Sequence, residues 1–202
     1  MIHHTRSKKL CTAVGLLLSC GALVVAVQEA ATRFGHFAYK EAAADALRAA
    51  GNYRATDRVV QLAVPAAEAF AKLRTAALAD GVKLVPISGF RTVEYQRGLF
   101  NRAIKRYGSE ARAARWVAPP GYSEHHTGLA LDIGDESEPA CDTEPCFVKT
   151  RASEWLKKNA ARFGFELSFP QNHGAVSYEP WHWRFIGDES SRKIFAAARA
   201  AE

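Results

Sequence analysis

The sequence predicts an α+β domain, with a small antiparallel sheet flanked by helices, after an N-terminal apolar helix. Segments with helical spacing and short segments with strand-like alternation both occur, but without a regular β-α-β order. The length of 202 residues suits one domain, and 48% hydrophobic and 24% charged residues are ordinary for a globular protein. We expect a signal peptide or membrane anchor over 1–29, a helical linker over 30–52 and a folded domain over 53–202.

The N-terminal 29 residues combine a basic start with an uncharged apolar stretch. The run RSKK precedes residues 10–27, LCTAVGLLLSCGALVVAV. This order is typical of an export signal, and the apolar stretch is just long enough to span a bilayer as a helix. Because the basic side stays in the cytoplasm, we expect the rest to be exported to the periplasm or cell envelope. Two alternatives remain open: a cleaved signal peptide, or an anchor in the inner membrane over residues 10–27.

The net charge of +6 does not indicate a nucleic-acid partner, because no stretch concentrates it and the densest run is the RSKK of the export signal. We therefore expect no nucleic-acid binding. A mildly basic surface is compatible with an anionic polymer such as a cell wall.

Two helices are predicted in the first part of the chain. The alanine-rich stretch from Ala30 to about Gly51 predicts a helix that leads away from the membrane. Apolar residues at helical spacing over 59–78 predict the next helix, with Thr56 as its N-cap. Pro65 is expected to end or kink this helix early.

The remaining predicted elements are a mixture of short strands and amphipathic helices. They are a strand over 82–87, a helix from Thr92 to about Tyr107, a strand within 128–134, a helix over 151–163 closed by Gly164, and strands over 165–169 and 181–186.

The segment SEHHTGLALDIG, residues 123–134, carries the first candidate chemistry. Its leucines and isoleucine alternate after Gly128, so Asp132 is expected on the face opposite the core. Gly128 allows a turn that brings His125 toward this carboxylate. Taken alone, the segment is equally compatible with an exposed loop histidine and an aspartate at a strand end.

The segment YEPWHWRF, residues 178–185, contains the second group of candidate functional residues. Its aromatic residues alternate with His182 and Arg184, which predicts that these two share a polar face. Pro180 removes a donor from the ladder, so the strand is expected to begin after it and leave Glu179 free to turn. Taken alone, the segment is better explained as an aromatic core strand with an incidental histidine.

Together the two segments supply two histidines and one carboxylate, with a fourth coordination position open. This is the pattern of catalytic zinc, whereas structural sites close the shell, typically with cysteines. His125, Asp132 and His182 are therefore the predicted ligands of one Zn²⁺ per chain. Glu179 would lie nearby as a general base that takes a proton from the attacking water.

Three segments, SGFRTVEYQ, SEHHTGLALDIG and YEPWHWRFIG, resemble the VanY-type D-alanyl-D-alanine carboxypeptidases. That family belongs to a wider group of zinc peptidases that shares its fold with lysostaphin-like enzymes and the hedgehog signalling domain. The group motif S-x-H-x-x-G-x-A-x-D is matched in full between Ser123 and Asp132. The later E-x-x-H is matched by Glu179 and His182. The resemblance covers about half of the chain, roughly Val82 to Gly187.

The resemblance implies the same zinc ligands, the same base and a zinc carboxypeptidase domain over 53–202. It also implies that Arg91 holds the substrate and the developing oxyanion, and that Gln96 and Ser123 line the substrate site. His126 is expected to be a neighbour of the metal site and not a ligand. The expected partners are peptidoglycan stem peptides ending in D-alanine, and the membrane if the N-terminal segment is uncleaved.

Three other functions remain open. An L,D-carboxypeptidase or a peptidoglycan endopeptidase could use the same site, because loops and not motifs determine which bond is cut. A non-catalytic wall-binding module is the third, since hedgehog shows that the fold can serve signalling.

Cys141 and Cys146 flank a polar, proline-containing stretch. In an oxidising compartment such a pair is more often a disulfide than a metal site, and no further ligands lie nearby. We expect the two cysteines to form a disulfide.

Overall fold

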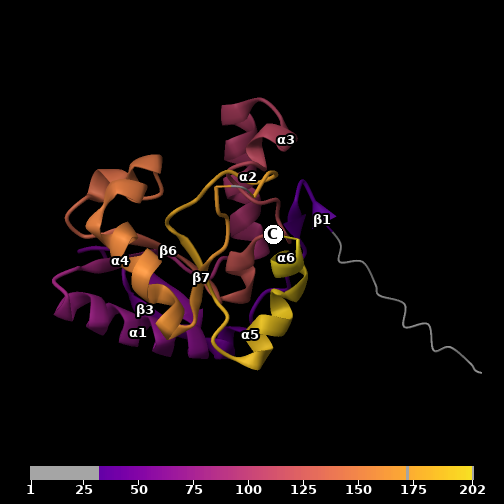
Figure 1. Cartoon of the computed structure of the whole chain (residues 1–202). Coiled ribbons are helices and arrows are strands. Elements are labelled where there is room, and N and C mark those ends of the chain that lie inside the picture. The colour runs from indigo at the N-terminus through magenta and orange to yellow at the C-terminus, as the bar shows by residue number, and fades with distance from the viewer. Residues whose placement is uncertain (1–31, 172, 202) are drawn as a thin grey trace, which may run out of the picture.

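The computed structural model of the protein describes residues 32–171 and 173–201 (Figure 1). The predicted apolar helix, and with it the signal peptide or anchor over 1–29, lies outside these residues. Within the described ranges, no helix is both long enough and apolar enough to cross a membrane.

A four-stranded sheet in the order β5-β6-β8-β7 forms the centre of the domain, and all of its neighbours are antiparallel. The strands are β5 (Leu84–Ser88), β6 (Ala130–Asp135), β8 (His182–Phe185) and β7 (Phe165–Leu167). This confirms the predicted α+β class with a small antiparallel sheet. The register places Asp132 of β6 directly opposite His182 of β8.

One face of this sheet packs against helices α1 (Val64–Ala79) and α4 (Arg151–Asn159), which lie side by side with it in Figure 1. The shared core is apolar and buried, and it includes Leu131, Ile133, Trp183, Phe70 and Leu156. Because side chains alternate along a strand, the residues between these core positions emerge on the opposite face. That face is the one that carries Asp132 and His182.

The helical linker predicted over 30–52 is wrong for its described part. Residues 32–52 form β1 (Thr32–Arg33), β2 (His36–Phe37), a 3-10 turn and β3 (Leu47–Asn52). The last of these pairs with β4 (Val59–Ala63) in a two-stranded antiparallel sheet. Cross-strand pairing has overridden the helix propensity of the alanines, so this stretch is part of the folded domain.

The helix predicted over 59–78 is correct only in its second part. Its first five residues are strand β4, and α1 begins at Val64. Pro65 lies in the first turn of α1, where its missing N–H needs no intrahelical partner. The proline therefore marks the start of the helix and not an early end.

The later predicted elements are confirmed. Helix α2 (Val93–Tyr107) begins after Thr92, whose hydroxyl accepts a hydrogen bond from the backbone N–H of Tyr95 at 3.0 Å. Helix α4 continues as a 3-10 turn to Phe163 and stops at Gly164, which has a positive φ of 79°. The remaining helices are α3 (Glu110–Ala113), α5 (Glu189–Ile194) and α6 (Ala196–Ala200).

Replacing Leu131 by Ala tests the core beneath the site. Leu131 is fully buried on β6, so we expect its truncation to lower the free energy of unfolding by about 2–5 kcal/mol. Urea denaturation followed by circular dichroism measures this. Val59→Ala is the matched control, because Val59 is 52% exposed, and its cost should stay below about 1 kcal/mol. Equal costs for the two variants would contradict this description of the core.

Candidate metal centre

Three buried residues form a group that could hold a metal ion: His125, Asp132 and His182. His125 comes from the 3-10 turn Glu124–Thr127, and the other two come from β6 and β8. One ligand atom from each lies within 4.8 Å of the others. The turn from His125 into β6 passes through Gly128, whose φ of 67° and close approach to Ala63 leave no room for a side chain.

Each histidine places a ring nitrogen near an oxygen of the Asp132 carboxylate, at separations close to those around a tetrahedral zinc ion. His125 Nε2 lies 3.4 Å from Asp132 Oδ2, and His182 Nδ1 lies 3.0 Å from Asp132 Oδ1. Metal bonds of about 2.1 Å in tetrahedral geometry place neighbouring ligand atoms about 3.4 Å apart. Nitrogen and carboxylate donors are also the ones that zinc takes in catalytic sites. The donor types therefore suit zinc, and one ligand atom from each residue lies close enough to the others for a single ion.

A backbone contact orients the His125 ring, and its surroundings keep it in the neutral form that can bind a metal. Its Nδ1 is 2.7 Å from the carbonyl oxygen of Gly89, so Nε2 is the nitrogen that faces Asp132. Burial, and then the nearby Arg91 guanidinium, lower the pKa of His125 to about 4. The ring is therefore neutral near pH 7, as a metal ligand must be.

Glu124 holds the His182 ring from its other side, and the sequence did not reveal this role. Its Oε2 lies 3.0 Å from His182 Nε2, and its Oε1 accepts a hydrogen bond from Arg184 at 3.1 Å. Burial alone would raise the pKa of Glu124, but the His182 hydrogen bond and the Arg184 charge hold it at about 2. With Nδ1 facing Asp132, this is the carboxylate–histidine support seen around metal ligands.

Glu179 lies beside the three candidate ligands without joining them. Its Oε2 is 4.0 Å from His182 Nδ1, and its backbone carbonyl accepts a hydrogen bond from the His182 N–H at 3.0 Å. This turn agrees with the prediction that β8 begins after Pro180. Burial raises the pKa of the Glu179 carboxyl to about 8. A carboxyl that titrates near neutral pH can both accept and return a proton.

Arg91 reaches the metal group from the loop after β5. Its guanidinium donates to Asp132 Oδ2 at 2.7 Å, to the Ser88 hydroxyl at 2.8 Å and to Gln96 Oε1 at 3.4 Å. Gln96 also donates to the backbone carbonyl of Ala118 at 2.8 Å. The arginine is thus held at a fixed position next to the candidate ligands.

The other candidate residues surround the same space. Gln96 and Ser123 are buried and line the cavity that contains the three ligands. His126 is close but faces away: its Nδ1 lies 2.8 Å from the Arg91 carbonyl oxygen, and its Nε2 accepts from the Gly121 N–H at 3.1 Å. It holds two loops together, as expected of a neighbour that is not a ligand.

The metal group lies in a cleft with a cavity volume of about 430 Å³. Helix α2, with Arg106 and Tyr107, and the segment after α3, with Trp116, form one side. His36 also lines the cleft and places its Nε2 2.7 Å from the Ala114 carbonyl oxygen. His36 lies in the stretch that the sequence assigned to a linker, so it was not recognised as part of the site.

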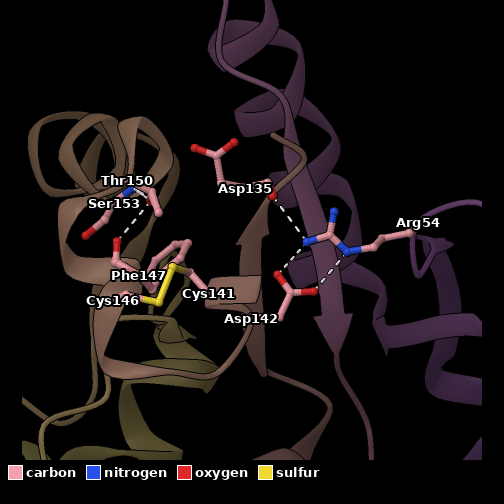
Figure 2. Close-up of a disulfide and its surroundings, with 8 residues drawn as sticks. All are labelled: Arg54, Asp135, Cys141, Asp142, Cys146, Phe147, Thr150 and Ser153. Atoms are coloured by element: carbon pink, nitrogen blue, oxygen red, sulfur yellow. Dashed lines mark hydrogen bonds and ion pairs between the residues drawn. A yellow bond between two sulfur atoms is a disulfide. The ribbon is translucent and has the colours of Figure 1, made fainter. Parts of the chain in front are cut away.

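The predicted disulfide between Cys141 and Cys146 is present, and Figure 2 shows it with its surroundings. It closes a short loop whose residues Thr143, Glu144 and Pro145 line the same cleft. The loop is therefore part of the site and not a distant addition.

Two buried histidines, one buried carboxylate and a separate glutamate, facing an open cleft from an antiparallel sheet, define a mononuclear metallopeptidase site. The family model described as VanY, D-alanyl-D-alanine carboxypeptidase, matches residues 59–188. The chain belongs to this family. The match begins at β4 and contains all of the candidate ligands and the glutamate.

A similar curated protein is a D-alanyl-D-alanine carboxypeptidase of Enterococcus faecalis (strain ATCC 700802 / V583). It is 37% identical over an alignment of 131 residues, and the match covers 59% of this chain and 46% of that protein. The chain spans about half the length of the first curated relatives that it matches.

Solved structures show the same fold in enzymes of two specificities. The LdcB LD-carboxypeptidase has a TM-score of 0.65 and 30% identity, covering 77% of this chain and 73% of its own. A VanY D,D-pentapeptidase in complex with Zn(II) has a TM-score of 0.56 and 32% identity, covering 70% of this chain and 82% of its own. VanYB in complex with D-alanine-D-alanine has a TM-score of 0.59 and 30% identity, covering 78% and 84%.

Replacing Glu124 by Gln tests the support of the His182 ring. Removing such a carboxylate typically weakens metal binding by about 10–100-fold, and we expect a loss of this size in zinc affinity. Competition with a chromophoric chelator measures the affinity without any assay of activity. Glu154→Gln, an exposed change on α4, is the matched control and should leave the affinity unchanged. An unchanged affinity in Glu124→Gln would show that Glu124 does not support the metal site.

Zinc binding should depend on pH because the metal displaces a proton from His182. Burial lowers the pKa of this histidine, but its hydrogen bonds to Asp132 and Glu124 outweigh that effect and raise the pKa to about 10. The metal-free ring is therefore protonated at pH 7, and zinc must replace the proton on Nδ1. The apparent affinity should rise by at least about tenfold per pH unit from pH 6 to 8, because a bound cation would also lower the pKa of Glu179 and release its proton. A pH-independent affinity, after correction for the competing chelator, would contradict this.

Proposed function

We propose that the protein is a zinc-dependent D-alanyl-D-alanine carboxypeptidase that removes the terminal D-alanine from peptidoglycan stem peptides. The observation that carries this proposal is the buried group of His125, Asp132 and His182, with Glu179 beside it at an open cleft. Membership of the VanY family supports the reaction. Zn(II) in a related VanY supports the metal, and the ligand of VanYB supports the substrate.

In this reaction Glu179 would move the proton. Bound zinc supplies Lewis-acid chemistry, because it polarises the scissile carbonyl and makes water nucleophilic near neutral pH. A cation in the site would also lower the pKa of Glu179 from about 8, so that the carboxylate form accepts a proton from the attacking water. Glu179 would then return this proton to the amine of the departing D-alanine.

Arg91 would stabilise the negative charge that develops on the carbonyl oxygen. Its guanidinium already lies 2.7 Å from Asp132 and is oriented by Ser88 and Gln96. A donor that is oriented in advance needs no rearrangement as the charge forms, which makes it effective in the transition state. Gln96 and Ser123 would line the space that the substrate occupies.

We also propose that the protein is exported and works in the periplasm or cell envelope. The basic start and apolar stretch of residues 1–29 support export. The disulfide supports it too, because disulfides persist in oxidising compartments. A cleaved signal and an anchor over residues 10–27 predict different masses for the mature protein, which mass spectrometry distinguishes.

An L,D-carboxypeptidase is the second candidate, favoured by the TM-score of 0.65 to LdcB. Both activities would use the same metal group and the same base. Incubation with muropeptides separates them: D,D activity shortens pentapeptides to tetrapeptides, whereas L,D activity shortens tetrapeptides to tripeptides. Separation of cross-linked chains would instead indicate an endopeptidase.

Replacing Glu179 by Gln tests the base. The variant should still bind one zinc per chain, because Glu179 is not a candidate ligand, but D-alanine release from a synthetic pentapeptide should fall about 10²–10⁴-fold. A chelator should abolish release by the unmodified protein, and added zinc should restore it. Glu154→Gln serves as the control with unchanged turnover. Zinc-replete protein that releases no D-alanine would contradict the proposed reaction, and full activity in Glu179→Gln would contradict the assigned base.

A further inference from the structure

We propose that the loop closed by Cys141 and Cys146 is a specificity-determining wall of the cleft. In this proposal Glu144 binds a cationic amine on a substrate side chain close to the scissile bond. The proposal rests on the proposed function and adds a substrate feature to it. In stem peptides, a diamino acid supplies such an amine.

The loop is held rigidly at its base. The disulfide joins its two ends, whose Cα atoms are 5.3 Å apart. Asp142 accepts hydrogen bonds from Arg54 Nε at 2.9 Å and from Arg54 Nη2 at 2.6 Å, as drawn in Figure 2. The hydroxyl of Tyr53 adds a third bond to this carboxylate at 3.0 Å. A two-point arginine–carboxylate contact fixes orientation as well as distance.

The same contacts attach the loop to β6, the strand that carries Asp132. Arg54 Nη2 also donates to the backbone carbonyl of Asp135 at 3.2 Å. Asp142 Oδ1 packs so closely on Gly134 that a side chain at that position would lie 2.5 Å from it. On the other side, the fully buried Phe147 anchors the chain in the core. The position of the loop relative to the metal group is thus set by direct contacts.

Glu144 lies in the middle of this fixed loop and lines the cleft together with the candidate ligands. It is exposed, and its carboxylate has no hydrogen bond or ion pair with any other described residue. The other acidic residues of the cleft lining are already engaged or buried at the metal group: Glu124, Asp132 and Glu179. Glu144 is therefore the carboxylate on this rim that is available to a cationic ligand group.

The test compares two synthetic peptides ending in D-alanyl-D-alanine, one with L-lysine before that pair and one with L-norleucine. Norleucine keeps the aliphatic chain but lacks the amine. The zinc-loaded unmodified protein should prefer the lysine peptide. Glu144→Gln should lower kcat/KM for that peptide about threefold to tenfold, mainly through KM, and leave the norleucine peptide unaffected. Added salt should shrink the lysine preference, because it screens the pair.

Glu138→Gln is the matched control, since Glu138 is an exposed glutamate that lies just before the same loop and does not line the cleft. Glu138→Gln should leave kcat/KM unchanged for both peptides. The Cys141→Ser, Cys146→Ser double variant should weaken the lysine preference, because it removes one restraint on the wall. Equal losses for both peptides in Glu144→Gln, or no lysine preference in the unmodified protein, would overturn the proposal.

Binding separates this inference from the proposed reaction. Calorimetry on zinc-loaded Glu179→Gln, with and without Glu144→Gln, compares the two peptides without turnover. Tighter binding of the lysine peptide that depends on Glu144 supports the proposed role of the loop in specificity, even where no D-alanine is released. Equal binding of the two peptides, or binding of neither, overturns it.

Discussion

The antiparallel pairing of β6 with β8 is the constraint on which the metal group depends. Asp132 and His182 are direct cross-strand partners, so both side chains leave the sheet on the same face and lie within reach of one ion. A slip of one residue would exchange them for Leu131 and Trp183, which belong to the core. The apolar core under α1 and α4 therefore fixes the register, and the register fixes the spacing of two of the three candidate ligands.

The same register creates a buried network of charges behind the metal group. Arg184 pairs with Ala130 and emerges two residues from His182, where Glu124 contacts both His182 and Arg184. Glu166 of β7 accepts from Arg184 Nε at 2.7 Å. Burying such charges is costly unless each has a partner, and here each contact also restricts the neighbouring side chain. The orientation of one imidazole thus depends on residues from three strands and a turn.

Local periodicity explains which features were predictable. The alternation of side chains predicted that Asp132 and His182 lie on polar faces, and Pro180 predicted where β8 begins. Both predictions were possible because these features depend on residues that are adjacent in the sequence. Residues 32–52 were assigned to a helix because the alanines show a local preference, whereas their actual pairing is with β4. Glu124 was missed for a related reason: its partners lie 58 and 60 residues away, and only the folded sheet brings them together.

The packing of residues 32–52 determines where the chain can be shortened. β3 covers the edge of β4, and the backbone N–H groups of Tyr39 and Ala42 donate to the carbonyls of Gly121 and His126. A chain cut at residue 53 would expose an unpaired strand edge, which invites aggregation, and would remove His36 from the lining of the cleft. A shortened version for biochemistry should therefore be trimmed ahead of β1, which keeps all of these contacts and omits the apolar stretch.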